Sequence, residues 1–193
     1  MKNIAIFASG SGSDMQSVVD ATLSGQIDGR VAALVANKEG IFAIERAKTH
    51  GIDYKTFLLG EYENNEARDK AIVEYLKPYN IDLIVLAGYL AIVTPILVDE
   101  YKDRIINIHP SLIPKHCGIG MYGLNVHRSV IASGDKVSGC TVHFVDYGAD
   151  TGKIIEQVEV PVKDGDTPET LQARVLEQEH KLLPSVVARL CKK

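Results

Sequence analysis

One run of the sequence, RIINIHPSLIP at residues 104–114, places an amide and an imidazole at the end of a buried apolar strand. Asn107 and His109 are two residues apart, so in an extended strand they project from the same face. A later run, HFVDYGADTG at residues 143–152, is a polar, glycine-broken loop in which Asp150 could reach that imidazole and set its tautomer and charge. An amide donor, a histidine and a carboxylate together favour acyl transfer.

A second chemical signal is the glycine-rich turn ASGSGSD at residues 8–14. Its glycines allow backbone amides to converge on an anion, and the helix that follows adds its positive end, so a phosphate would fit there. The alternative is a tight turn that needs Gly10 and Gly12 only for positive φ. No Lys-Ser/Thr pair follows the glycines, and Asn37 rather than an acid ends the second strand, so neither a nucleoside triphosphate nor a nicotinamide cofactor is indicated.

The elements that position these residues follow a βαβ pattern, in which short β-branched runs alternate with helical ones. Strands are expected at 3–8, 31–36, 54–57, 81–87 and 104–108, with helices at 13–24, 42–50, 63–79 and from Thr94-Pro95 onward. The pattern then changes to strands 137–145 and 153–162, an expected antiparallel hairpin, and a helix at 167–191. The sequence therefore predicts one doubly wound α/β domain over residues 1–193, with a mainly parallel sheet and an antiparallel C-terminal hairpin.

The composition is that of a compact enzyme, with 193 residues, 46% of them hydrophobic, and a net charge of −4. No apolar run approaches the ~20 residues of a membrane span. Met1 leads directly into the first strand rather than into a signal sequence, so we expect a cytoplasmic protein. Scattered basic residues argue against a nucleic-acid surface. Small molecules are the expected partners, and the sequence leaves open whether a homodimer forms.

The three cysteines are an odd number without paired spacing, so a disulfide scaffold or a zinc site is not expected. Cys117 follows His116 directly, but no third or fourth ligand lies nearby in the sequence. We predict reduced thiols and no metal. Residues 115–126, which contain several glycines and tyrosines, are expected to form a mobile lid.

The run NIHPSLIP followed by VHFVDYGADTG resembles the folate-dependent formyltransferases, whose catalytic triplet falls on Asn107, His109 and Asp150. The resemblance runs from about residue 4 to about residue 184, and the short length and SGSGSD loop are similar to the members that formylate phosphoribosylglycinamide in de novo purine biosynthesis. It implies a Rossmann-like formyltransferase fold, 10-formyltetrahydrofolate as cosubstrate and no tightly bound cofactor. It also implies a cis peptide bond at Ile113-Pro114.

The same resemblance implies a set of binding residues. The substrate's phosphate would lie at Gly12, Ser13 and Asp14, and its glycinamide end would meet Glu179. His143 would support the active-site loop. The folate would contact the following residues: Asn65, Leu90, Ala91, Ile92, Val93, Asp146, Tyr147, Gly148 and Ala149.

This chain departs from the family pattern at four of its positions. Asp14 replaces a usual asparagine, and a carboxylate beside a phosphate is repulsive unless it turns away to cap the helix. Asn65 and Ala91 stand where many relatives carry an arginine and a basic residue, so weaker recognition of the folate's glutamate tail is expected. Lys153 replaces a frequent proline after the catalytic loop.

The expected mechanism is attack of the substrate's primary amine on the formyl carbon, which gives a tetrahedral oxyanion. Asn107 and a protonated His109 would donate hydrogen bonds to that oxygen. Asp150 would raise the imidazole pKa by pairing with the cation, and would relay the amine proton, through water, to the departing folate nitrogen.

Three alternatives remain at the level of sequence. Formyltetrahydrofolate hydrolase shares the triplet but has an additional N-terminal regulatory domain, and the methionyl-tRNA enzyme adds a C-terminal domain and a basic surface. Neither addition is expected in this acidic chain, which begins at its first strand. A non-enzymatic phosphate-binding α/β domain would account for the glycine loop, but it would not require Asn107, His109 and Asp150 together.

Overall fold

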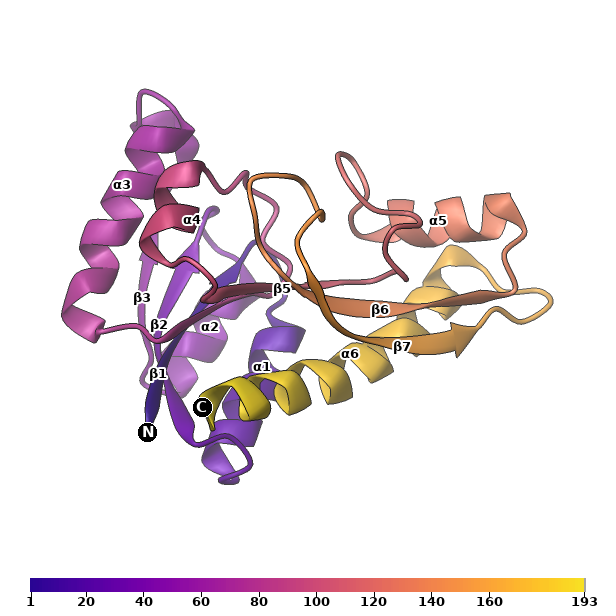
Figure 1. Ribbon diagram of the computed structural model, residues 1–193, viewed down its shortest axis with the longest axis horizontal. Helices are drawn as coiled ribbons and strands as arrows, with labels where there is room; N and C mark the ends of the chain where they lie inside the picture. Colours follow the sequence, from indigo (N-terminus) through magenta and orange to yellow (C-terminus); the bar gives the residue numbers. More distant parts are fainter. Residues whose placement is uncertain (193) are drawn as a thin grey trace.

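The computed structural model describes residues 1–192 and is built around a seven-stranded sheet of order β3-β2-β1-β4-β5-β6-β7 (Figure 1). The strands from β3 to β5 pair in parallel, and β6 and β7 continue the sheet in antiparallel fashion. The fold class predicted from the sequence is therefore confirmed. The strand bounds are β1 Lys2–Ala8, β2 Gly29–Ala36, β3 Asp53–Thr56, β4 Leu83–Leu86, β5 Ile105–His109, β6 Val137–Phe144 and β7 Ile154–Pro161.

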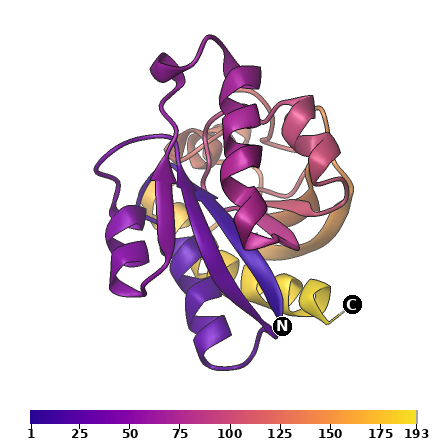
Figure 2. The same cartoon turned by 90° about the vertical axis from the view of Figure 1, so that its left-hand side faces the viewer.

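Helices cover both faces of the sheet, as the view from its side shows (Figure 2). Helices α3 and α4 pack on one face, and α1, α2 and α6 pack on the other. The long α6 runs under the β6–β7 hairpin and back toward the N-terminus (Figure 1). The helix bounds are α1 Ser13–Leu23, α2 Phe42–Thr49, α3 Asn65–Leu76, α4 Pro95–Glu100, α5 Leu124–Ser133 and α6 Pro168–Cys191, with short 3₁₀ turns η1 Leu59–Glu61 and η2 Lys77–Tyr79. Among residues 1–192, no helix combines the length and the apolar character that crossing a membrane requires.

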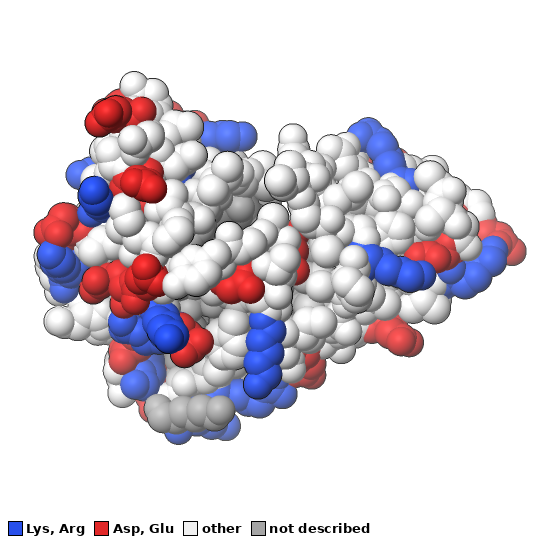
Figure 3. Space-filling model, turned by 45° about the horizontal axis from the view of Figure 1, so that its top comes forward, with Lys and Arg blue, Asp and Glu red and all other residues white. Residues whose placement is uncertain are grey.

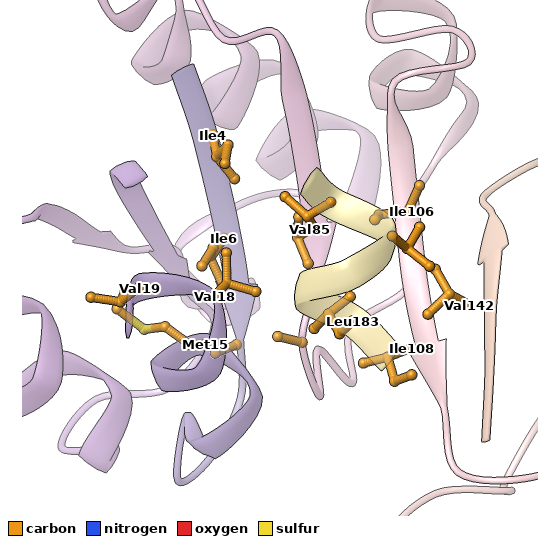
Figure 4. Close-up of a cluster of buried hydrophobic side chains, with 14 of the residues drawn as sticks. Ile4, Ile6, Met15, Val18, Val19, Val85, Ile106, Ile108, Val142 and Leu183 are labelled. Carbon is orange, nitrogen blue, oxygen red and sulfur yellow. The ribbon is translucent and has the colours of Figure 1, made fainter. Parts of the chain in front are cut away.

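Period-two alternation along β1 divides the core into two layers. Ile4 and Ile6 pack toward α1 and α6, whereas Ala5 and Phe7 pack toward α3 and α4. Figure 4 shows the first layer, in which side chains from β1, α1, β4, β5, β6 and α6 meet. Each such fully buried aliphatic side chain contributes about 1.5–3 kcal/mol to folding.

Local signals explain most element ends. Asn64 caps α3 by accepting the Ala67 N–H, so that helix begins later than the expected residue 63, and it gives way to η2 after Leu76. Thr167 and Thr170 form a reciprocal capping box at the start of α6. Pro184 lies inside α6 without ending it.

The carboxyl ends of β1, β4 and β5 lie at one edge of the sheet, where open α/β folds place ligands. Gly12 sits at the start of α1 with φ 70°, and a Cβ there would lie 2.8 Å from that of Ala43, so only glycine fits. The Ile113-Pro114 bond is cis, as predicted.

Candidate active site

A cavity of about 850 Å³ opens at this edge of the sheet. It is lined by the glycine loop, the segment 86–93 after β4, the end of β5, residues 118–123, the loop 143–150 and one face of α6. Figure 3 shows a hollow near the middle of this side of the molecule, bordered mainly by uncharged side chains, with most Lys and Arg lying away from it. All of the predicted site residues except Asn65 line the cavity.

The β5–β6 register places Asn107 opposite His143 and fixes the orientation of both side chains. His143 Nδ1 lies 2.8 Å from the Phe144 carbonyl, so this nitrogen carries hydrogen and the Nε2 atom is free to accept. Asn107 Nδ2 donates to that Nε2 at 3.1 Å and reaches Asp150 Oδ1 at 3.4 Å. The longer of these two hydrogen bonds is the one that a ligand oxygen can replace.

His109 lies beside Asp150, and its two ring nitrogens have different partners. Nε2 is 2.9 Å from the His116 carbonyl, which can only accept, so Nε2 carries hydrogen. Nδ1 faces Asp150 Oδ2 at 3.6 Å. Burial lowers the pKa of His109 and outweighs the opposing charge of Asp150, so the pKa lies below its ordinary value. The charge of Asp150 raises this pKa, as expected, but desolvation is the larger effect and the pKa is lowered overall.

Asp150 lies in a turn with φ 58°, and its carboxylate accepts hydrogen bonds from the Asn107 amide and from a backbone N–H. The Gly118 N–H donates to its Oδ2 at 2.9 Å, and Gly152 allows the loop to turn, since a Cβ there would lie 1.7 Å from the Phe144 carbonyl oxygen. Burial alone would raise the Asp150 pKa, but its hydrogen-bonded and charged surroundings, including His109 and the Gly118 N–H, lower it overall. Asp150 is thus a carboxylate throughout the neutral range.

Asp14 and Glu179 bring two carboxyl groups to the opposite wall of the cavity. Asp14 does not cap α1, because its side chain accepts no hydrogen bond from the described residues, and its Oδ1 lies 3.7 Å from His180 Nε2. Burial raises the pKa of Asp14 to about 6. Glu179 is only 6% exposed, and burial together with the charge of Asp14 raises its pKa well above the usual range.

The segment from Leu90 to Val93 lines the cavity and is held from behind by a buried ion pair. Arg68, 1% exposed, donates to Asp69 Oδ1 from Nε at 3.0 Å and from Nη2 at 2.7 Å, and Nη2 also donates to the Ile92 carbonyl. Asp69 Oδ2 accepts the Thr94 N–H at 2.7 Å. Asn65 accepts from Arg68 at 3.1 Å and does not line the cavity, so the structure does not bring it together with the other predicted folate-binding residues.

Several groups that line the cavity were not predicted from the sequence. His127 is buried in the cavity wall, where desolvation lowers its pKa to about 4. Gln172 and Leu176 come from the face of α6 that also carries Glu179, a helical spacing that the sequence does contain. The Gly118 N–H and the His116 carbonyl are backbone groups, for which no sequence signal exists. Within residues 1–192, no cluster of side chains is suited to hold a metal ion.

Residues 2–187 match the family model described as Formyl transferase, and the chain belongs to that family. The fold described above is thus that of a formyltransferase-family protein.

Individual members of this family are similar to the chain over almost its whole length. The chain is 41% identical over 187 residues to the phosphoribosylglycinamide formyltransferase of Haemophilus influenzae, covering 97% of this chain and 86% of the relative. It is 39% identical to the phosphoribosylglycinamide formyltransferase of Escherichia coli, covering 96% of this chain and 85% of that relative. The glycinamide ribonucleotide transformylase 1 structure from Symbiobacterium toebii superposes with a TM-score of 0.94 at 38% identity, covering 100% of this chain and 88% of that one. The structure of phosphoribosylglycinamide formyltransferase from Bacillus halodurans superposes with a TM-score of 0.93 at 39% sequence identity, covering 100% of this chain and 96% of that one.

Proposed function

We propose that this protein transfers the formyl group of 10-formyltetrahydrofolate to the primary amine of phosphoribosylglycinamide, a step of purine biosynthesis. The observation that carries the proposal is the cavity in which Asn107, His109 and Asp150 lie between a glycine loop and the 90–93 segment. The relatives from Haemophilus influenzae and Escherichia coli, which match almost the whole chain, are named phosphoribosylglycinamide formyltransferase. The folate acts as a cosubstrate, and no tightly bound cofactor is needed.

The reaction begins when the amine attacks the formyl carbon, so that a C–N bond forms and the carbonyl electrons move to oxygen. Asn107 Nδ2 turns its weaker hydrogen bond from Asp150 to that oxygen, while His143 continues to hold the amide in orientation. A donor already directed at the developing charge stabilises the tetrahedral intermediate without reorganisation.

His109 enters the reaction neutral, because burial lowers its pKa. Its Nδ1, the nitrogen that faces Asp150, takes the proton of the attacking amine, and Asp150 stabilises the imidazolium that forms. The intermediate then collapses, the bond from carbon to the folate nitrogen breaks, and that nitrogen receives the proton. This order replaces the expected starting state in which His109 is already protonated.

The two substrates occupy the two sides of this centre. The amides of Gly12 and Ser13 and the start of α1 bind the phosphate of phosphoribosylglycinamide, with Asp14 beside it, and Glu179 orients the amine end. On the other side, Leu90 to Val93 and the loop 146–149 hold the pteridine. Asn65 belongs to the support of this second pocket rather than to its wall.

A stoichiometric assay tests the function directly. Purified protein and 10-formyltetrahydrofolate should release tetrahydrofolate only when phosphoribosylglycinamide is present, with one formylated product per folate. Equal release of tetrahydrofolate without the acceptor would identify a hydrolase instead. No release of tetrahydrofolate, with or without the acceptor, would leave a phosphate-binding domain. Asn107→Leu should lower turnover by about 10²–10³, as loss of one oxyanion donor does.

All of the residues named in this proposal belong to one chain. Small molecules are its ligands. We infer a cytoplasmic location, because Cys117, Cys140 and Cys191 are all free thiols, as is usual in a reducing compartment.

A further inference from the structure

The loop that follows the cis proline contacts both halves of the proposed proton-transfer pair through its backbone. The His116 carbonyl accepts from His109 Nε2 at 2.9 Å, and two residues later the Gly118 N–H donates to Asp150 Oδ2 at 2.9 Å. Residues 116–118, called the clamp loop below, therefore determine the positions of both groups. Neither contact depends on a side chain of this loop.

The first contact also determines which nitrogen of His109 is reactive. A carbonyl oxygen cannot donate, so the hydrogen of the neutral ring must sit on Nε2, and the lone pair must sit on Nδ1 opposite Asp150. Displacement of the carbonyl would allow the other tautomer, in which Nδ1–H would donate to Asp150 and no lone pair would remain on Nδ1 to accept the amine proton.

The side chain of His116 is what anchors the clamp loop. Its Nδ1 lies 2.8 Å from Ser129 Oγ on α5, and its Nε2 lies 3.0 Å from Asp135 Oδ2, just beyond the end of that helix. The ring is 13% exposed, and its backbone has φ 51°, a conformation that few residues adopt without compensating contacts. Both ring nitrogens are thus used to tie the loop to α5.

The groups that face the ring are few. Ser129 and Asp135 contact it directly, and Lys115 pairs with the same Asp135 at 3.1 Å from the solvent side. The contacts of His116 and Lys115 lower the pKa of Asp135, so this carboxyl is ionised near neutral pH and accepts from the ring. Ser129 does not line the cavity, so its hydroxyl serves the ring rather than a substrate.

We propose that His116 is a positioning residue: by binding Ser129 and Asp135 it holds its own carbonyl against His109 and so fixes the His109 tautomer required for proton transfer. The proposal rests on the proposed function for the role of that tautomer. The tautomer itself is a property of the protein without substrates.

The test reads the His109 ring by ¹⁵N NMR in substrate-free protein labelled at its six histidines, with the signals assigned from a His109→Gln spectrum. Wild-type protein should show hydrogen on Nε2 only. His116→Gly keeps the backbone conformation accessible but removes the ring, and should give a mixture of tautomers with kcat reduced about tenfold or more and both KM values little changed. His116→Asn, which tolerates positive φ and keeps an amide donor, should recover part of both effects.

Lys115→Ala is the matched control, since it removes the exposed ion pair to the same Asp135 and leaves the ring contacts intact. It should change neither tautomer nor kcat. Wild-type tautomer and kcat in His116→Gly would overturn the proposal, and so would wild-type protein without hydrogen on Nε2. If His116→Gly does not fold, Ser129→Ala and Asp135→Asn should each give a mixture of His109 tautomers and a lower kcat. An unchanged His109 tautomer in both variants would again refute the positioning role of His116. Failure of formylation with a normal wild-type tautomer would count against the proposed function alone.

Discussion

Burial and ion pairing act in opposite directions on His109, and burial is the stronger effect. Asp150 is 3.6 Å away, beyond a direct hydrogen bond, so its attraction for the imidazolium is incomplete in the free protein. In the proposed mechanism the pair therefore receives a proton during the reaction rather than holding one beforehand.

The His109–Asp150 pair should show this in both rate and pH dependence. His109→Ala and Asp150→Asn should each lower formylation by about two orders of magnitude, and the double variant should lose far less than the product of the two effects. In the wild type, kcat should fall as pH drops through the His109 pKa, below about 6.5, because the protonated ring cannot accept a proton. Asp150 does not cause this fall, since its own pKa lies below its usual range.

Circular dichroism and thermal melts would control for folding in these variants. Equal loss of folded protein, or effects that simply multiply, would show that the two residues are structural or act separately.

Asp14 should make substrate binding sensitive to pH and salt. Its pKa of about 6 leaves it charged at pH 7.5, where it repels a phosphate. Asp14→Asn should therefore lower the KM for phosphoribosylglycinamide several-fold with kcat little changed, since it removes a like-charge contact with the phosphate. The ratio of the two KM values should approach one as pH falls below 6, where Asp14 becomes neutral, and as salt rises.

Protonation of the substrate's own phosphate weakens the same repulsion in the wild type, so it moves the ratio in the same direction as protonation of Asp14. Asp20→Asn on the same helix removes the same charge from an exposed position outside the cavity, and should leave the KM unchanged. A ratio that is independent of both pH and salt would contradict a role for the Asp14 charge.

At the scale of elements, α3 supports the cosubstrate pocket without lining it. Arg68 joins this helix to the backbone of the 90–93 segment, and its neighbour Asp69 holds Thr94 at the end of the same segment. A segment of irregular backbone is thereby given partners for its polar groups, which buried backbone requires.

Arg68→Met should destabilise the protein by about 3–5 kcal/mol, because it leaves the Asp69 carboxylate buried and unpaired. The KM for 10-formyltetrahydrofolate should rise more than the KM for phosphoribosylglycinamide, since the Ile92 carbonyl loses the hydrogen bond that Arg68 donates. Urea denaturation and separate titrations of the two substrates would measure these effects.

Asn65→Ala is the control for the Arg68 change, as it removes one acceptor of Arg68 and preserves the ion pair. Its cost should stay near 1 kcal/mol, the usual value of one hydrogen bond. A similar loss in both variants, or equal changes in the two KM values, would show that the ion pair does not act on this pocket.

At the scale of the whole molecule, one core layer joins the two ends of the chain. Ile4 and Met15 from the first βα unit pack in the same cluster as Val142 and Leu183 from the C-terminal hairpin and α6. The cavity lies between these regions, so its shape depends on their remaining packed together.

We accordingly expect residues 1–193 to unfold as one domain. Calorimetry should show a single transition whose calorimetric and van't Hoff enthalpies agree. Leu183→Ala, which creates a cavity in the shared layer, should lower stability by about 2–5 kcal/mol and still give one transition. Two separable transitions in either protein would contradict the single-domain prediction.

The sequence by itself determined the elements and the chemical identity of the centre. Hydrophobic periodicity of two and of 3.6 residues, together with capping and turn residues, is local information, and it predicted the parallel sheet, the hairpin and the long α6. The spacing of Asn107 and His109 placed both on one strand face, the polar loop at residues 143–152 offered Asp150 as the carboxylate, and the family resemblance joined the three in one triplet. Element ends differed by one to three residues where a cap such as Asn64 decided them.

Only the tertiary structure decided how these groups are held and in which protonation state they rest. The lowered His109 pKa depends on how much water the folded chain excludes, and no local pattern records that quantity. The tautomer depends on the His116 carbonyl, and every residue has a carbonyl. Only the fold buries the charged side chain of Arg68 against Asp69. Long-range contacts set burial and backbone partners, and these in turn determine what the side chains named in the sequence can do.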